Sequence, residues 1–139
     1  MSGWPEYVKT LMGYSDVAEV AIIGQECKTV WAASENSNLG KIKSEQVTSL
    51  LGNINNLQTT GVTLGDKKYT FVRQEEDDSI PGGWSWLTLS AKTEDRTSAI
   101  VQKTCRTLII MESKNSVTKG TNLLCYVAPT VAHLKQSGY

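Results

Sequence analysis

The chain has little of what most catalytic and metal sites are built from. Among its 139 residues there is one histidine, His133, and the three cysteines, Cys27, Cys105 and Cys125, form no Cys-x-x-Cys pair. A structural zinc site needs more such ligands at closer spacing. The sequence also contains neither the dinucleotide-binding nor the P-loop glycine pattern. We therefore predict that the protein is not an enzyme and holds no cofactor and no metal.

Charge of one sign and long apolar runs are also absent. The formal net charge is +0, from 14 basic and 14 acidic residues, so nothing favours nucleic acid as a partner. No apolar run approaches the ~20 residues that a bilayer span needs. The odd cysteine count and the lack of a charged-then-apolar leader favour reduced thiols. We expect a single domain over residues 1–139, soluble, cytoplasmic and monomeric.

Two weak options for catalysis stay open. Cys125 and His133 make a nucleophile–base pair only if the tail brings them together, because eight residues of helix separate them by about 12 Å. The acidic run from Glu75 to Asp78 is a conceivable cation site. It lacks the alternating ligands and the glycine of a calcium loop, and charge runs are usually solvated.

Hydrophobic spacing predicts a helix at each end of the chain and strands between them. Helical spacing occurs over residues 3–12 and about 120–137, and a small helix begins at Ser44 and ends before Gly52. Strand-like segments, separated by turn residues, occupy 17–24, 28–34, 61–65, 68–74, 84–92, 97–104 and 106–112. Consecutive short strands indicate an antiparallel sheet. The expected class is therefore α+β, with both end helices packed on a common sheet.

Three local features add expectations. Pro129 inside the last helix costs ~3 kcal/mol, which predicts a kink or a helix that restarts there. Residues 75–83 are expected to form one acidic, glycine-rich loop. Trp84 and Trp86 are two apart on a strand, so we expect both on one face, filling the core or forming an additional contact surface.

Aromatic and amphipathic residues gather near both termini. Each one alone is explained by filling a seam between an end helix and the sheet. If the end helices lie side by side, the set instead forms a shallow surface of stacked rings with outward Trp and Tyr donors. Such a surface suits a proline-rich peptide in a polyproline II helix, which exposes carbonyl acceptors. The residues are Trp4, Tyr7, Trp31, His133, Leu134 and Tyr139.

Four stretches resemble the profilins, specifically the animal members, over essentially the full length. They read SGWPEYVKTLM, AIIGQECKTVWAAS, GVTLGDKKYTFVR and HLKQSGY. The resemblance implies a central antiparallel sheet with the N- and C-terminal helices on one face and small helices on the other. It also implies a cytoplasmic, cytoskeleton-associated protein that binds monomeric actin, accelerates nucleotide exchange on actin and delivers monomers to proline-rich elongation factors.

The resemblance also assigns residues to two binding sites. The six residues named above, from the two chain ends and from the early strand that carries Trp31, match the polyproline site of the family. The actin-binding positions match Lys68, Thr70, Phe71, Arg73, Lys92, Val117 and Gly120. Family membership further suggests phosphoinositide binding, which we expect to be weak because Lys67 and Lys68 near Arg73 are the only modest basic cluster.

The segment SVTKGTNLLCYVAPT departs from the family pattern. Animal profilins have a Gly-Val-His-Gly-Gly-like turn followed by a polar, basic helix start, whereas this chain lacks the turn histidine and places Leu123 and Leu124 at the helix start. One lost charge pair at an interface core costs about 2–5 kcal/mol. The sequence therefore leaves open a second interpretation, a divergent adaptor that binds proline-rich ligands with weak or no actin binding.

Overall fold

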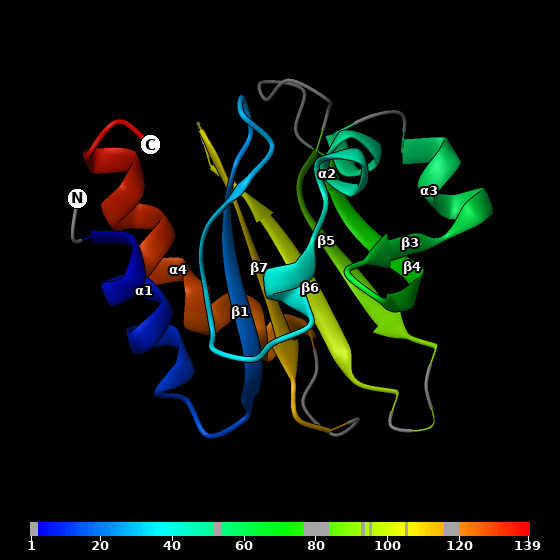
Figure 1. The fold of residues 1–139 in the computed structure, drawn as a ribbon, viewed down its shortest axis with the longest axis horizontal. Coiled ribbons are helices and arrows are strands. Elements are labelled where there is room, and N and C mark those ends of the chain that lie inside the picture. The colour runs from blue at the N-terminus through cyan, green and yellow to red at the C-terminus, as the bar shows by residue number, and fades with distance from the viewer. Residues whose placement is uncertain are drawn as a thin grey trace.

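The computed structural model describes residues 3–51, 54–76, 84–92, 94, 96–104, 106–115 and 120–139. A 7-stranded antiparallel sheet lies at the centre of the fold, in the order β2-β1-β7-β6-β5-β4-β3 (Figure 1). The strands are β1 (Val17–Gly24), β2 (Val30–Ala33), β3 (Val62–Leu64), β4 (Lys67–Glu76), β5 (Trp84–Ala91), β6 (Ser98–Lys103) and β7 (Thr107–Ser113). The helices are α1 (Gly3–Met12), the 3-10 turn η1 (Leu39–Lys41), α2 (Ser44–Leu51), α3 (Ile54–Thr60) and α4 (Gly120–Gln136).

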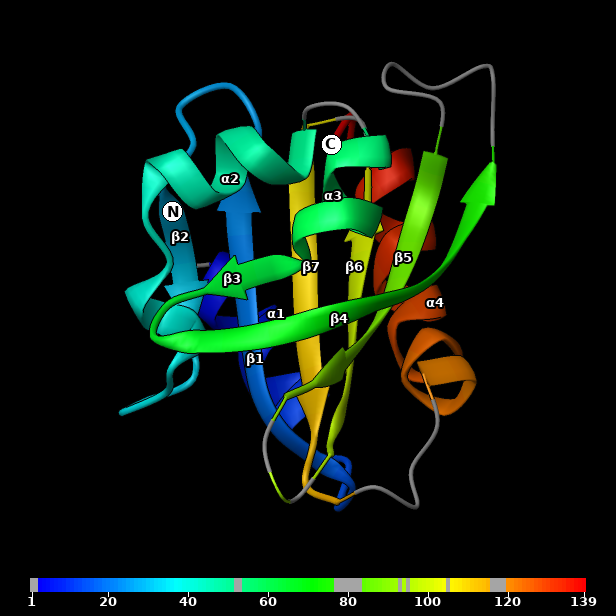
Figure 2. The same ribbon diagram turned by 90° about the vertical axis from the view of Figure 1, so that its right-hand side faces the viewer.

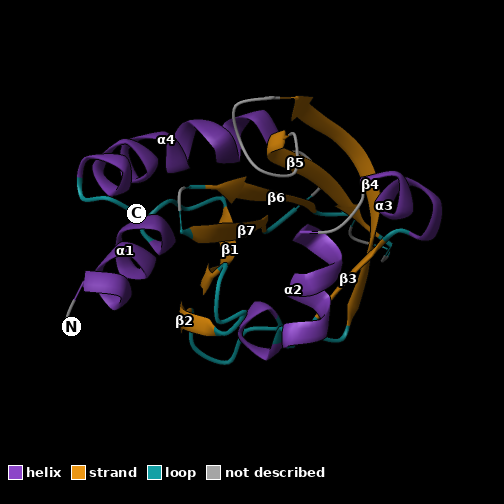
Figure 3. Ribbon diagram, turned by 90° about the horizontal axis from the view of Figure 1, so that it is seen from above, coloured by secondary structure: helices purple, strands orange, loops and turns teal. Residues whose placement is uncertain are grey.

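The helices divide between the two faces of the sheet. Seen from above, α1 and α4 lie together on one face, and α2 and α3 lie on the other (Figure 3). The first and last segments of the chain are therefore neighbours in space. The α+β class and this distribution of helices, both expected from the sequence, are confirmed.

Two hydrophobic cores follow from this layering, one on each face. On β1, Ile22 packs with α1 and α4, whereas Ile23 packs on the opposite side with η1, α2 and β5. Successive side chains of a strand point to opposite faces, so a central strand covered on both sides must be apolar throughout. The residues of β1 from Val20 to Gly24 are accordingly all buried.

The core beneath the terminal helices joins them to the sheet. Leu11 of α1 is fully buried, as are Leu123 and Val127 of α4, against Ile100 and Ile109 of the strands. Burying each of these side chains contributes about 1.5–3 kcal/mol. The two helices are therefore fixed relative to one another mainly through the sheet on which both pack.

Most of the expected elements are present, and three details differ. Helix α3 was not predicted. Helix α4 continues through Pro129, so the expected restart is not found; Pro129 lies on its exposed side. Strand β4 continues through Glu76, so the first part of the expected acidic loop is strand, and residues 77–83 lie outside the described part of the chain.

A buried polar cluster ties β4 to β7. The carboxylate of Glu112, only 2% exposed, accepts hydrogen bonds from the hydroxyls of Tyr69 and Thr97 and pairs with the ammonium group of Lys67. Burial, with the neighbouring Glu112 carboxylate, raises the pKa of Tyr69 far above its usual value. Tyr69 therefore remains a donor to Glu112 at any physiological pH.

We predict that Glu112→Ala lowers the free energy of unfolding by about 3–5 kcal/mol, because Lys67 and Tyr69 lose their shared acceptor inside the protein. Urea unfolding measures the change. The control is Lys41→Ala, which breaks the exposed Lys41–Asp66 pair and should cost less than about 1 kcal/mol. Equal effects of the two substitutions would contradict the role given to the buried cluster.

Candidate functional site

Five aromatic rings meet where the two ends of the chain lie together. The Trp4 ring is central, with centroid distances of 5.8 Å to Tyr7, 4.9 Å to Trp31 and 5.1 Å to Tyr139. The Tyr7 ring continues the series to His133 at 5.7 Å. These are ordinary aromatic contact distances. We call these five residues the terminal aromatic cluster.

The cap of α4 holds Tyr139 in this cluster. Gly138 has φ +88°, which allows the chain to turn back at the end of the helix. The Tyr139 N–H then donates to the Leu134 carbonyl at 2.8 Å and the Gly138 N–H to that of Lys135 at 3.3 Å, the Schellman pattern. The Tyr139 carbonyl accepts the Arg106 N–H at 2.7 Å. The last residue is thus fixed to both α4 and the start of β7.

Trp31 is positioned by a glycine beneath it. A Cβ at Gly24 would lie 2.4 Å from the Trp31 ring, so only glycine lets the indole lie directly over β1. The indole N–H donates to the Cys27 sulfur at 3.2 Å. The hydrogen bond with Thr29 lowers the pKa of the Cys27 thiol, and the hydrogen bond from Trp31 lowers it further, by a smaller amount.

Exposure separates the members of the predicted proline-binding set. Trp31 is 36% exposed and His133 is exposed, whereas Trp4, Tyr7 and Tyr139 are half-buried. Leu134 is 1% exposed and packs in the core beneath the rings. The structure therefore brings all six predicted residues together, five as an accessible ring surface and Leu134 as its support.

A second surface lies at the other end of the sheet, on β4 and β5 (Figure 2). Thr70 pairs with Ser90 and Arg73 with Thr88, and cross-strand partners share a face. That face points away from the core residues Tyr69 and Leu89. We call it the outer face of β4–β5.

A β-bulge between Phe71 and Arg73 gives this face its composition. Simple alternation would place Arg73 on the core side with Tyr69 and Phe71. The register shifts between Phe71 and Arg73, so that Arg73 is exposed and Val72 is 55% exposed. The bulge therefore adds a cation to the outer face, beside Val72, which alternation with Thr70 already places there.

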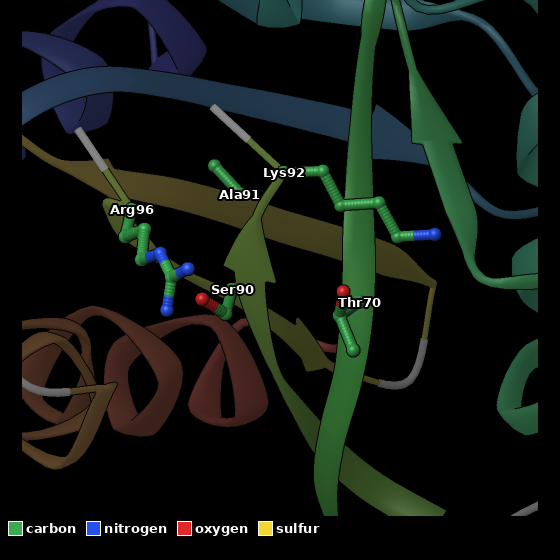
Figure 4. A pocket seen from close by; sticks show the side chains of 5 residues that line it. All are labelled: Thr70, Ser90, Ala91, Lys92 and Arg96. Atoms are coloured by element: carbon green, nitrogen blue, oxygen red, sulfur yellow. The ribbon is translucent and has the colours of Figure 1, made fainter. Parts of the chain in front are cut away.

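An open hollow of about 550 Å³ lies at the end of this face. Figure 4 shows Arg96 reaching toward Ser90 while Lys92 extends across β4. The Lys92 ammonium group lies 3.5 Å from the position that a Cβ would take at Gly61. The hollow thus has two cationic groups at its rim and Thr70 and Ser90 hydroxyls in its lining.

The predicted actin-binding residues divide accordingly. Lys68, Thr70, Arg73 and Lys92 are exposed, whereas Phe71 is half-buried and packs against the core with Tyr69. Gly120 is the first residue of α4, and Val117 lies outside the described residues. Sequence reasoning missed Val72 and Arg96. The charge at Arg73 was an available signal for the bulge, because alternation would have directed it into the core.

Three other expectations change in the structure. Trp84 and Trp86 do not share an environment: Trp84 is fully buried in the core with Leu87, whereas Trp86 is half-buried opposite Glu75. Lys67 binds the buried Glu112, so it does not add to a basic surface with Lys68. Leu123 is fully buried on the side of α4 that packs on the sheet, so it does not replace a polar group on the surface.

The catalytic option at Cys125 and His133 gains no geometric support, and Asp77 and Asp78 of the acidic run lie outside the described residues. Cys125 and His133 are both exposed on one unbroken helix, α4, which keeps them about 12 Å apart along its axis. Within the described residues, no group of three or more His, Cys, Asp or Glu side chains is placed to hold a metal ion. Among those residues there is also no helix long and apolar enough to cross a membrane.

Comparisons with known proteins agree with this architecture. The profilin family model matches residues 2–139. Human profilin-1 is 29% identical over 145 residues, covering 100% of both chains, and profilin-2 of Caenorhabditis elegans is 27% identical over 143 residues with the same coverage.

Solved structures give the same result. Mouse profilin IIa, in complex with a double repeat from the FH1 domain of mDia1, superposes with a TM-score of 0.86 at 25% identity, covering 99% of this chain and 100% of that one. Human profilin II gives a TM-score of 0.81 at 27% identity, covering 96% and 99%. The chain therefore belongs to the profilin family, whose members bind actin and proline-rich ligands and regulate actin polymerisation.

Proposed function

We propose that this protein is a cytoplasmic, monomeric, single-domain profilin that binds actin monomers, accelerates their nucleotide exchange and brings them to proline-rich partners. The observation that carries the proposal is the terminal aromatic cluster, with the outer face of β4–β5 at the other end of the same sheet. A protein that delivers one partner to another needs two separate binding surfaces, one for each partner.

The terminal aromatic cluster fits a polyproline II helix. That helix has three residues per turn, no internal hydrogen bonds and exposed carbonyl groups. The tilted rings of Trp4, Trp31 and Tyr139 offer flat surfaces on which pyrrolidine rings pack. The double FH1 repeat bound to mouse profilin IIa supports a ligand of this kind for the present chain.

The outer face of β4–β5 is proposed as the actin side. It carries Lys68, Arg73 and Lys92, which match the basic positions of the family, together with the exposed Val72 at the bulge. The apolar start of α4 is compatible with this proposal because Leu123 is directed into the core. We expect weak phosphoinositide binding, since Lys67 lies on the inner side of β4 with Tyr69, paired with Glu112, and adds no cation to this face.

A second candidate function has one observation in its favour. From Gly120 to Leu134, α4 contains no Asp, Glu, Lys or Arg. If actin recognition in this protein depends on charges at that helix, the molecule is instead an adaptor for proline-rich ligands with little actin affinity.

We predict that Trp31→Ala weakens binding of a decaproline peptide about tenfold or more, because it removes an exposed ring from the cluster. Isothermal titration measures the affinity. The matched control is Tyr14→Ala: Tyr14 is also 36% exposed, but it stacks on Tyr126 outside the cluster. The control should bind the peptide like the wild type, and equal loss in both variants would contradict the assignment.

We predict that Gly24→Ala also weakens peptide binding, because the added methyl group would lie 2.4 Å from the indole and force Trp31 away from Trp4. A several-fold loss is expected if stacking contributes about 0.5–1.5 kcal/mol. The matched control is Gly40→Ala, where a Cβ meets no atom closer than 3.3 Å. Unchanged peptide affinity in Gly24→Ala would show that the position of Trp31 is not critical.

We predict that Lys92→Ala weakens binding of monomeric actin and slows actin nucleotide exchange, while the decaproline affinity stays unchanged. Titration with actin and release of a fluorescent nucleotide from actin provide the two readouts. Peptide binding by the wild type with no heat from actin would favour the adaptor function instead.

A further inference from the structure

Trp86 is a large side chain that neither hydrophobic core uses. It lies on β5 opposite Glu75 of β4 and Gln102 of β6, and it is half-buried. Among the described residues that pack on the two cores, its neighbour Trp84 is present and Trp86 is not. Trp86 therefore leaves part of a large apolar ring accessible to water without packing in either core.

The Trp86 ring is instead contacted by a cation from the neighbouring strand. The Arg73 guanidinium carbon lies 5.6 Å from the ring centroid, within the range of a cation–π interaction. Arg73 reaches this position because the bulge at Val72 turns it to the outer face. Backbone geometry therefore places an apolar side chain, a cation and an indole side by side at the surface.

The surroundings of this group indicate the chemistry of its partner. Lys68, Lys92 and Arg96 lie on or beside the same face, where Glu75, opposite Trp86, is an acidic neighbour on β4. The cations gather here although the chain as a whole has a formal net charge of +0. Such a concentration of cations suits a protein surface that carries carboxylates. Tryptophan and arginine are also the residue types most often found at the energetic centre of protein interfaces.

We propose that Trp86, with Arg73 stacked on its ring, anchors the actin monomer on the outer face of β4–β5. This proposal rests on the proposed function and adds a contact that the match to family positions did not assign. The indole packs against an apolar part of the partner, while Lys92 and Arg96 pair with carboxylates around it. Because both residues lie on strands, the pair contributes to actin affinity independently of the altered segment before α4.

The test is isothermal titration of monomeric actin with the full chain as wild type, Trp86→Ala, Arg73→Ala and the double variant. We expect Trp86→Ala to weaken actin binding about tenfold or more. Because the two side chains act together, the double variant should lose less than the product of the two single losses. The decaproline affinity of each variant reports that it is folded, and Arg73→Ala removes only an exposed side chain. Tyr14→Ala, which removes an exposed ring outside both surfaces, is the control for loss of an aromatic side chain and should bind both actin and decaproline like the wild type.

The outcomes separate this proposal from the proposed function. If Trp86→Ala and Arg73→Ala bind actin within about twofold of the wild type while Lys92→Ala is weakened, Trp86 is not an anchor and actin binding stands. If the wild type binds decaproline but gives no heat with actin, the actin function and this proposal both fail. A multiplicative loss in the double variant would overturn the paired role of the two residues.

Discussion

Packing of the first and last helices on one face of the sheet is the constraint on which the rest of the molecule depends. It buries Leu11 of α1 and Val127 of α4 in a common core with β1, β6 and β7. It also brings Trp4 and Tyr139, separated by nearly the whole chain, to a ring distance of 5.1 Å. The same apolar contacts therefore stabilise the fold and assemble the terminal aromatic cluster.

The two proposed binding surfaces are shaped by different devices. At the terminal aromatic cluster, two glycines set the geometry. Gly138 allows the chain to turn back, and Gly24 leaves room for the Trp31 ring. On the outer face of β4–β5, a one-residue bulge turns Arg73 outward. Since the two surfaces share no residue, changes in one are expected to leave the other intact, which a protein that links two partners requires.

The sequence predicted the helices at both ends and all seven strands, because their periods of 3.6 and 2 are strong and turn residues separate them. It also predicted that the aromatic residues near the termini converge. Helix α3 was missed because its residues, INNLQTT, contain few helix formers, and Leu57 is its one residue in the described core. The contact between Arg73 and Trp86 depends on the β-bulge and on strand register, which local periodicity does not determine.

The effect of the unusual α4 segment could not be predicted from the sequence either, because it depends on which side of the helix each residue faces. In the sequence, Leu123 stands where a polar contact was expected, and only the structure shows that it is directed into the core. The burial of Leu123 removes one argument against actin binding, and the absence of Asp, Glu, Lys and Arg from Gly120 to Leu134 is the argument that remains.

The central claim is that one chain binds two partners on separate surfaces. The most direct measurement is the affinity for decaproline with and without a saturating concentration of monomeric actin, together with the mass of the species formed. The account predicts equal peptide affinities and a complex with one copy each of the protein, actin and peptide. Competition between actin and the peptide would contradict it.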